Sequence, residues 1–195
     1  DNPLAFVMFA FPWGQPGTPL EHFKGPRKWQ REVLQEITDH IAQNKGKLDF
    51  NTLRHAVSSG RGIGKSALVS WITIWMLTTT IISANSESQL RSVTWAEITK
   101  WLATAINSHW FEVSATRVMP AKWLTELVER DLKKGTRYWG VEGRLWSAEN
   151  PDAYAGVHNF DGVLVVFDEA SGIDDSIWAV TSDVTAALVD TAYPL

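Results

Sequence analysis

A glycine-rich stretch in the first half of the chain has the residue types that bind phosphate: Ser59-Gly60-Arg61-Gly62-Ile63-Gly64-Lys65-Ser66. Its three glycines leave backbone N–H groups open to a polyphosphate and permit any positive φ that the wrap requires. Lys65 can reach the β and γ phosphates of a nucleotide, and the Ser66 hydroxyl can bind Mg²⁺. The stretch predicts a phosphate-binding loop, with a chance glycine-rich turn as the alternative. It departs from the usual pattern because Ser59 stands where Gly is common.

An acidic pair follows an apolar run about a hundred residues later. The run from Val163 to Phe167 is mostly β-branched, which suits a strand buried on both faces of a parallel sheet. Asp168 then lies at the carboxyl end of that strand, where ligands bind in open α/β sheets, and we expect it to hold Mg²⁺ directly or through water. Glu169 can act as a base or orient an attacking water. The two motifs together predict hydrolysis of a nucleoside triphosphate, and the start of a solvated loop is the alternative for the acidic pair.

The segments around both motifs predict the elements that position them. Residues 53–57 suit a strand before the loop, and residues 67–76 are apolar on most faces, as in a buried helix. Residues 80–84 suit a second core strand. A strand, a phosphate loop and a helix in this order predict an α/β fold in which helices flank a mainly parallel central sheet.

Three further helices are predicted from periodicity and capping residues. One spans Pro26 to Asn44, with apolar residues at positions 29, 33, 37 and 41. Another begins with the capping-box pattern from Ser86 to Gln89 and runs to about Asn107. The last starts at Asp174 or Asp175 and carries apolar residues at 177, 180 and 184.

Length and composition favour one globular domain. The chain has 195 residues, is 45% apolar and carries a net charge of −4, which argues against disorder and against a global basic field for nucleic acid. It has no cysteine, and its five histidines lack ligand spacing, so neither disulfides nor a zinc site are expected. We expect residues 1–25 to form an arm that packs on a P-loop ATPase domain of residues 26–195.

Both ends of the chain and one junction suggest boundaries. The apolar stretch at residues 4–11 is too short to span a bilayer and lacks a basic flank, so neither a membrane segment nor a signal peptide is expected. The predicted helix before Thr79 runs into a strand without turn residues, which suggests that a loop has been lost from this sequence near Thr79. Because the chain stops at Leu195 without a clear terminal element, we expect the domain to be truncated before its last strands.

The segment from residue 117 to residue 144 is the most basic part of the chain. Aromatic residues at 123, 138 and 139 are interleaved with the charges, so the segment could contact DNA phosphate or a neighbouring subunit. Four acidic residues lie in the same segment, and a solvated face of mixed charge is an alternative of at least equal weight. Its basic residues are Arg117, Lys122, Arg130, Lys133, Lys134, Arg137 and Arg144.

Several segments together resemble the ATPase domain of the large terminase subunit of tailed phages and prophages, a motor that packages DNA into procapsids. Residues 25–30 resemble the adenine-recognising Trp-Gln motif of this family, and residues 59–66 its phosphate loop, which tolerates a Ser at the start. Residues 82–91 and 147–158 resemble two further segments, and residues 163–170 resemble the acidic strand. The match spans about residues 3–190.

The resemblance implies a RecA-like P-loop NTPase fold of the ASCE type, in which an extra strand lies between the two nucleotide motifs. The gap between Lys65 and Asp168 leaves room for that strand. The nuclease domain of the family has no counterpart in this chain. Its coupling motif, a polar strand end after the acidic strand, is not visible either.

The resemblance also implies ATP and Mg²⁺ as cofactors. Trp29 and Gln30 would bind the adenine, although an exposed helix glutamine is the alternative for Gln30. The whole loop would bind the phosphates. Lys65, Glu169 and Arg61 are the expected catalytic residues. Arg61 would contact the γ phosphate, and pairing with an acidic surface is its alternative.

Implied partners are double-stranded DNA, a small terminase subunit and further copies of the chain in a ring on the portal of a procapsid, all in the host cell cytoplasm and without a membrane. A neighbour in such a ring often supplies an arginine to the site. The candidates are Arg117, Arg130, Arg137 and Arg144.

Two other function classes remain open. A superfamily 2 helicase or translocase shares the Gln motif and both nucleotide motifs but needs a second RecA-like domain. A non-hydrolysing nucleotide switch would use the fold for binding alone. The complete set of Lys65, Ser66, Asp168 and Glu169 argues against a switch.

Overall fold

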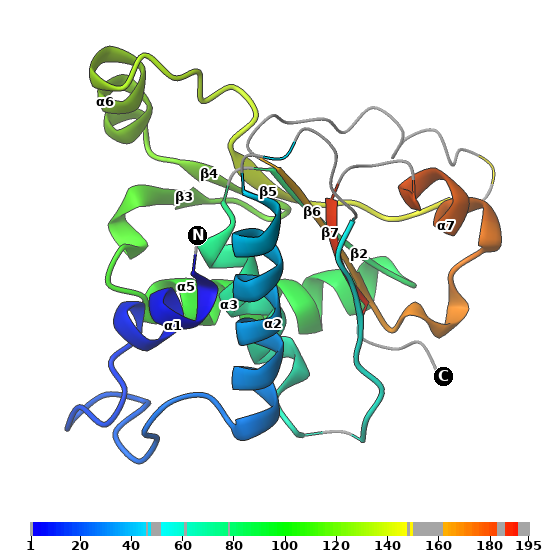
Figure 1. The fold of residues 1–195 in the computed structure, drawn as a ribbon, viewed down its shortest axis with the longest axis horizontal. Coiled ribbons are helices and arrows are strands. Elements are labelled where there is room, and N and C mark those ends of the chain that lie inside the picture. Colours follow the sequence, from blue (N-terminus) through cyan, green and yellow to red (C-terminus); the bar gives the residue numbers. More distant parts are fainter. Residues whose placement is uncertain are drawn as a thin grey trace.

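Seven strands form one mixed sheet in the part of the chain that the structure describes (Figure 1). This computed structural model describes residues 2–45, 47, 52–60, 62–77, 79–147, 149 and 162–182, together with the backbone of 186–190. The strands follow the order β1-β7-β6-β2-β5-β4-β3. They are β1 (Arg54–Ala56), β2 (Thr79–Ala84), β3 (Phe111–Val113), β4 (Arg117–Pro120), β5 (Gly140–Gly143), β6 (Val163–Asp168) and β7 (Ala186–Asp190).

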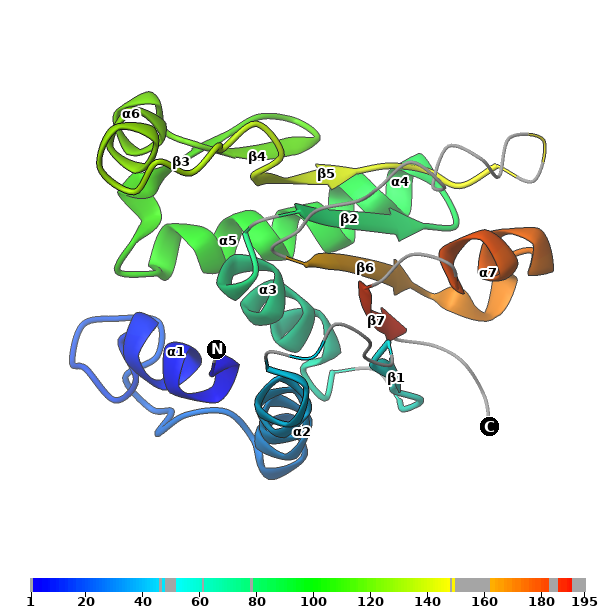
Figure 2. The ribbon, with the colours of Figure 1, turned by 45° about the horizontal axis from the view of Figure 1, so that its top comes forward.

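Helices cover both faces of this sheet, as Figure 2 shows from a second direction. α3 and α5 lie side by side on one face, with α1 and α2 beyond α3, whereas α7 lies on the other. The helices are α1 (Pro3–Ala10), α2 (Lys28–Asn44), α3 (Lys65–Trp75), α4 (Glu87–Gln89), α5 (Ala96–Thr104), α6 (Lys122–Asp131) and α7 (Asp175–Ser182).

Strand β6 is buried on both faces, as its apolar sequence predicts. Leu164 and Val166 pack in the core cluster beneath α3 and α5, whereas Val165 and Phe167 pack against α7 on the opposite face. All four side chains are at most 1% exposed. Burial of one such side chain stabilises the fold by roughly 1.5–3 kcal/mol. The strand that ends in Asp168 is therefore held firmly in the middle of the sheet.

Five strands are parallel, and their order corrects one expectation. β6 pairs with β2 on one side and with β7 on the other, and β7 pairs in turn with β1. The strand between the two nucleotide motifs is therefore β7, which follows the acidic strand in the sequence. The long segment between Lys65 and Asp168 was expected to supply it, but that segment instead forms the strands on the far side of β6. No pattern of residues had predicted β7.

An antiparallel extension forms the other end of the sheet. β4 pairs antiparallel with β5 and with β3, and α6 follows β4. Figure 1 shows α6 standing away from the other helices. The residue pattern of this segment predicts neither these strands nor α6.

The residues before α2 share the main core. Val7, Ala10 and Phe11 are at most 3% exposed and belong to the same cluster as α3 and α5. Trp13 donates a hydrogen bond from Nε1 to the carbonyl of Val7 at 2.8 Å, and its ring meets the ring of Trp71 edge to face at 5.6 Å. Such pairs add about 0.5–1.5 kcal/mol beyond burial. The division at residue 25 stays a prediction.

Some predicted helix boundaries shift in the structure. Pro26 precedes α2, whose N-cap is Arg27. The helical run after Ser86 begins with the expected cap, since Gln89 donates its backbone N–H to Ser86 Oγ at 3.1 Å, but it ends at Thr104 rather than near residue 107. Asp174 caps α7 through its bonds to Ser176, and these bonds lower the pKa of the Asp174 carboxyl.

Two further expectations concern the termini and the junction before β2. α3 ends at Trp75 and β2 begins at Thr79. The loss of a loop near Thr79 stays a prediction, as does truncation of the domain. Among the described residues, none of the helices combines the length and the apolar character that crossing a membrane requires.

Candidate functional site

The carboxyl ends of the parallel strands border a cleft of about 700 Å³. The phosphate loop follows β1, and the acidic pair ends β6, so the sheet brings the two motifs together. All predicted loop and acidic residues that the structure describes line the cleft, whereas Arg61 lies outside the described residues. The lining comprises Ser58, Ser59, Gly60, Gly62, Ile63, Gly64, Lys65, Ser66, Gln89, Val93, Glu97, Asp168 and Glu169.

Two glycines of the loop adopt backbone conformations that other residues avoid. Gly62 has φ 76°, and Gly64, the N-cap of α3, has φ 94°. A Cβ atom at Gly64 would also lie 2.8 Å from the Gln30 side-chain nitrogen. Only glycine fits this position without strain. The turn directs the start of α3, with its free N–H groups, into the cleft.

The Lys65 ammonium lies across the loop. It donates hydrogen bonds to the Ser59 carbonyl at 2.8 Å, to Ser59 Oγ at 3.0 Å and to the Gly60 carbonyl at 3.3 Å. Ser59, the departure from the usual pattern, thus provides a side-chain acceptor that glycine lacks. Ser66 follows in the first turn of α3, where its carbonyl accepts a hydrogen bond from Ser70 Oγ. Lysine and hydroxyl therefore share the same wall of the cleft.

The acidic pair is held by residues from the elements around β2. Thr94 is buried and donates its hydroxyl to Asp168 Oδ2 at 2.5 Å. Glu169 has left-handed backbone angles, φ 57° and ψ 48°, a conformation that costs free energy in residues other than glycine. Asn85, directly after β2, donates its side-chain amide to the Glu169 carbonyl at 2.8 Å. This bond helps to hold the strained backbone at Glu169, a residue that lines the cleft.

Gln30 lies behind the phosphate loop and is 2% exposed. Its carbonyl oxygen accepts the backbone N–H of Arg27 at 2.8 Å, and its nitrogen donates to the Gly64 carbonyl at 2.8 Å. The structure therefore ties α2 to the loop through Gln30. The alternative of an exposed helix glutamine is wrong, whereas the adenine contact stays a prediction.

An aromatic pocket of about 250 Å³ lies next to the loop, on the Gln30 side of α3. Gln30, Gly64 and Ala67 form its wall toward the loop, and aromatic rings form much of the rest. Trp29 is not among the residues that line the pocket or the cleft, and it packs against the core instead. The rings in the pocket are Trp13, Phe23, Trp71 and Trp101.

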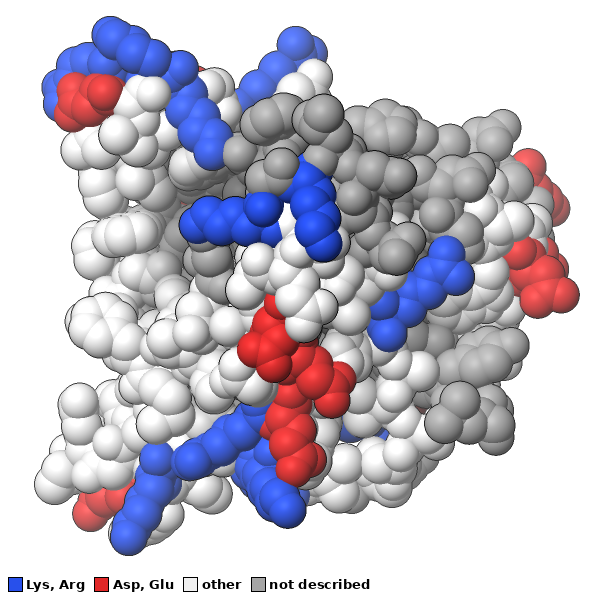
Figure 3. Space-filling model, in the orientation of Figure 1, with Lys and Arg blue, Asp and Glu red and all other residues white. Residues whose placement is uncertain are grey.

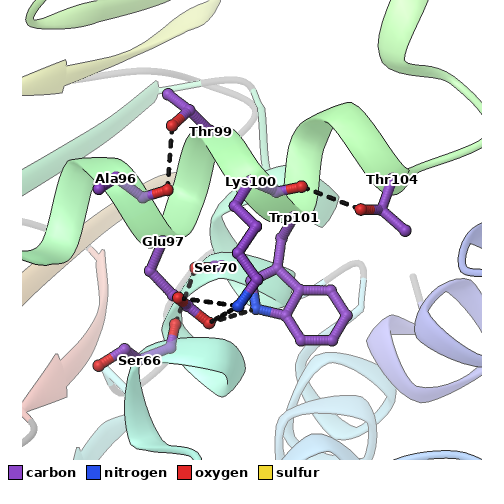
Figure 4. A network of polar contacts seen from close by, with 8 residues as sticks. All are labelled: Ser66, Ser70, Ala96, Glu97, Thr99, Lys100, Trp101 and Thr104. Carbon is purple, nitrogen blue, oxygen red and sulfur yellow. Dashed lines mark hydrogen bonds and ion pairs between the residues drawn. The ribbon is translucent and has the colours of Figure 1, made fainter. Parts of the chain in front are cut away.

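The helical run after β2 supplies cleft residues that sequence reasoning missed. Residues 90–95 form a π-helix between α4 and α5, a feature that often marks functional sites. Gln89, Val93 and Glu97 recur every fourth residue along this run and line the cleft. Figure 4 shows Glu97 with its carboxylate beside the first turns of α3. Their spacing of four residues places them on one face of a helix. Any exposed helix surface has the same spacing, so the sequence alone does not identify them as cleft residues.

The arginines proposed to act on a neighbouring subunit lie on the antiparallel side of the sheet. Arg117 and Arg144 both pair with Glu142, at 3.3 Å and 3.2 Å, and together with Arg137 they line a pocket of about 310 Å³. Arg130 pairs with Asp131 on α6. None of the four lines the cleft among the described residues.

Figure 3 shows how charge is distributed over one face of the molecule. Lys and Arg side chains gather over α6 and the segment after it, with acidic side chains among them, while acidic side chains form a stripe over α2. In the sequence the α2 acids are Glu32, Glu36 and Asp39, all exposed. The mixed charge around α6 matches the alternative of a solvated face as well as it matches a binding surface.

The cleft offers oxygen atoms of the kind that Mg²⁺ prefers: the Ser66 hydroxyl and the Asp168 carboxylate. In the described part of the chain, no group of three or more acidic or histidine side chains is arranged to hold a metal by itself. This donor set fits a magnesium ion that keeps several waters and gains phosphate oxygens from a bound nucleotide.

Comparison with known proteins gives a likeness of fold. No protein-family model and no curated protein matches the chain. A variant of the large terminase ATPase domain of Thermus phage P74-26 superposes with a TM-score of 0.50 at 18% identity, over 87% of this chain and 66% of that chain. A second structure of that domain gives a TM-score of 0.43 at 19% identity, over 76% and 62%. The chain thus spans just under two thirds of each solved structure. Its fold is that of a phage large terminase ATPase domain, which confirms the predicted resemblance at the level of fold.

Proposed function

We propose that this chain is the ATPase part of a DNA-packaging motor and hydrolyses ATP in the cleft between the phosphate loop and β6. One observation carries the proposal: two motifs a hundred residues apart in the sequence meet in one cleft, with lysine, hydroxyl and carboxylates on its walls. The likeness of fold to a terminase ATPase domain supports the same activity.

In the proposed reaction the loop binds and orients the triphosphate. Backbone N–H groups at the start of α3 and the Lys65 ammonium stabilise charge on the β and γ phosphates. Lys65 exchanges its present bonds to Ser59 and Gly60 for phosphate oxygens. Glu169 orients the attacking water and accepts its proton, and Arg61 contacts the γ phosphate.

Ser66 and Asp168 would hold Mg²⁺ in this scheme. Such an ion would supply positive charge that offsets the negative charge of the phosphates. Thr94 fixes the Asp168 carboxylate through its hydroxyl. We infer from this division of roles a RecA-like P-loop NTPase of the ASCE type, a class that the position of β7 between β1 and β6 supports.

The aromatic pocket beside Gly64 is our proposed site for the adenine. Its rings suit a flat heterocycle, and Gln30 lies in its wall. Because both ends of the Gln30 amide are already bonded, recognition of the base requires exchange of one bond. Trp29, which belongs to α2, would act indirectly by packing that helix against the core.

The proposed partners are double-stranded DNA, a small terminase subunit and further copies of the chain, which would form a ring on a portal. The proposed location is the host cytoplasm. The basic residues around β4, β5 and α6 are candidates for contacting DNA or a neighbouring subunit. A helicase-type translocase is the alternative that shares the same cleft, and strand separation would distinguish it.

Substitution of Lys65 tests the proposal. Lys65→Ala removes the positive side chain that is proposed to bind the β and γ phosphates. It should therefore lower phosphate release from ATP by about a hundredfold or more and weaken ATP binding. Lys47→Ala, outside the cleft, is the matched control and should retain wild-type activity. Wild-type turnover in Lys65→Ala would show that this cleft is not the hydrolytic site.

A further inference from the structure

Glu97 is a third carboxylate in the cleft, and neither nucleotide motif includes it. It lies at the start of α5 and lines the same cleft as Ser66, Asp168 and Glu169. Its side chain is 27% exposed, so the carboxylate is accessible from the cleft. A charged group facing bound phosphates has an electrostatic effect there whether or not it takes part in the reaction.

Two side chains from the next turn of α5 fix the Glu97 carboxylate in place. Trp101 donates its indole N–H to Oε1 at 2.7 Å, and the Lys100 ammonium lies 3.3 Å from both oxygens (Figure 4). Trp101 is itself locked in the aromatic cluster, with its ring 5.0 Å from that of Trp71. A carboxylate has about four acceptor sites, so Oε2 keeps the capacity to accept further hydrogen bonds from the cleft.

Direct coordination of a metal by the three carboxylates does not fit the geometry. No group of three acidic side chains among the described residues is close enough to hold an ion. Glu97 also lies across from the first turn of α3, where the Ser66 hydroxyl begins the proposed magnesium site (Figure 4). Magnesium retains several of its waters, and those waters need acceptors.

We propose that Glu97 is a positioning residue that accepts hydrogen bonds from the water shell of the nucleotide-bound magnesium ion. Lys100, its ion-pair partner, does not line the cleft, so the carboxylate is the charge of this pair that faces bound nucleotide. That negative charge attracts the Mg²⁺ complex and repels the metal-free nucleotide. Glu97 therefore makes tight nucleotide binding conditional on magnesium. The inference rests on the proposed ATPase function and adds a determinant of metal dependence to it.

A purely structural role for Glu97 has a different consequence. If the carboxylate only fixes the side chains of Lys100 and Trp101 on α5, its loss would change the binding of every nucleotide form in the same direction. The positioning role predicts opposite directions with and without magnesium. Glu97→Gln separates the two, because the amide oxygen can still accept from Trp101 Nε1 and from the Lys100 ammonium while the negative charge is removed.

The experiment is calorimetric titration of the whole chain with adenylyl imidodiphosphate, a slowly hydrolysed ATP analogue, with Mg²⁺ and with EDTA. For wild type we expect magnesium to tighten binding. In Glu97→Gln we expect weaker binding with Mg²⁺ and tighter binding with EDTA, so that the magnesium enhancement falls by about threefold or more. Glu87→Gln is the matched control, since Glu87 pairs with Arg91 in the same helical run and does not line the cleft.

The outcomes separate this inference from the proposed function. An unchanged magnesium enhancement in Glu97→Gln overturns the positioning role, even if both affinities change together. An enhancement reduced equally in Glu87→Gln also overturns it, because the effect would then be one of general charge. Wild type that binds no nucleotide under either condition overturns the proposed function itself, and this inference with it.

Discussion

The cleft end of the sheet and its antiparallel end carry charge in different ways. At the cleft, the Asp168 carboxylate accepts a bond from Thr94 and the Glu97 carboxylate one from Trp101, while Asn85 holds the backbone of Glu169. At the antiparallel end, charged side chains such as Arg130 and Asp131 pair with near neighbours on exposed surface. Exposed pairs contribute little and hold no fixed geometry. Preorganisation therefore distinguishes the region proposed to do chemistry from the region proposed to bind a partner.

The largest effect is expected from Gln30, which supports the cleft from behind. Gln30→Leu leaves the Gly64 carbonyl and the Arg27 N–H without their partners, which should lower the free energy of unfolding by about 2–4 kcal/mol. Urea denaturation measures the change. Gln35→Leu on the same helix is the control, since Gln35 is exposed and its side chain donates to Asp39 on the helix surface. Equal effects of the two substitutions would mean that the loop does not depend on α2.

Asn85 should affect turnover more than stability. Asn85→Ala removes the bond that holds the strained backbone of Glu169, and we expect phosphate release to fall by about tenfold with little change in nucleotide affinity. Asn44→Ala, which removes a similar amide-to-carbonyl bond at the end of α2, is the control. Unchanged turnover in Asn85→Ala would show that the cleft is less preorganised than its bonds suggest.

His55, in β1 on the cleft side of the sheet, should have a smaller effect, on the pH dependence of the free energy of unfolding. Burial in β1 lowers the pKa of His55 below its ordinary value of 6.5. His40 adds to this shift, and the Glu36 carboxylate, 3.3 Å away, opposes it. The unfolded chain then binds the proton more readily, so the free energy of unfolding should fall as the pH decreases below 6.5.

Denaturation at several pH values between neutrality and mild acid tests this dependence. His55→Gln should flatten the fall, whereas His22→Gln on the exposed segment before α2 should not. An identical pH profile for wild type and His55→Gln would remove His55 as its cause.

The smallest effect is expected at the antiparallel end. If this end contacts DNA, replacement of Lys133 and Lys134 by Ala should reduce the salt dependence of DNA binding by about one to two units of slope. Lys24→Ala with Lys28→Ala removes the same charge elsewhere. An unchanged slope would favour a solvated face and would sharpen the contrast with the cleft.

The sequence predicted the cleft better than the sheet around it. The phosphate loop and acidic strand are local patterns whose residue types state their chemistry, so Lys65, Ser66, Asp168 and Glu169 could be named in advance. β7 could not, because the five residues of this strand carry no pattern that distinguishes them from the end of a helix.

The supporting residues were missed for a related reason. Asn85 and Thr94 act through contacts with residues distant in the sequence: Asn85 bonds Glu169, 84 positions away, and Thr94 bonds Asp168, 74 positions away. Gln30 was singled out from a motif, but its burial behind the loop depends on how α2 packs. Tertiary contacts of this kind leave no periodic signal.

The most direct test of the account is the rate of ATP hydrolysis by this chain with Mg²⁺, measured with and without double-stranded DNA, for wild type and Glu169→Gln. We predict turnover in wild type that DNA stimulates, and its loss in Glu169→Gln with ATP binding retained. Equal turnover in wild type and Glu169→Gln would contradict the assignment of hydrolysis to this cleft.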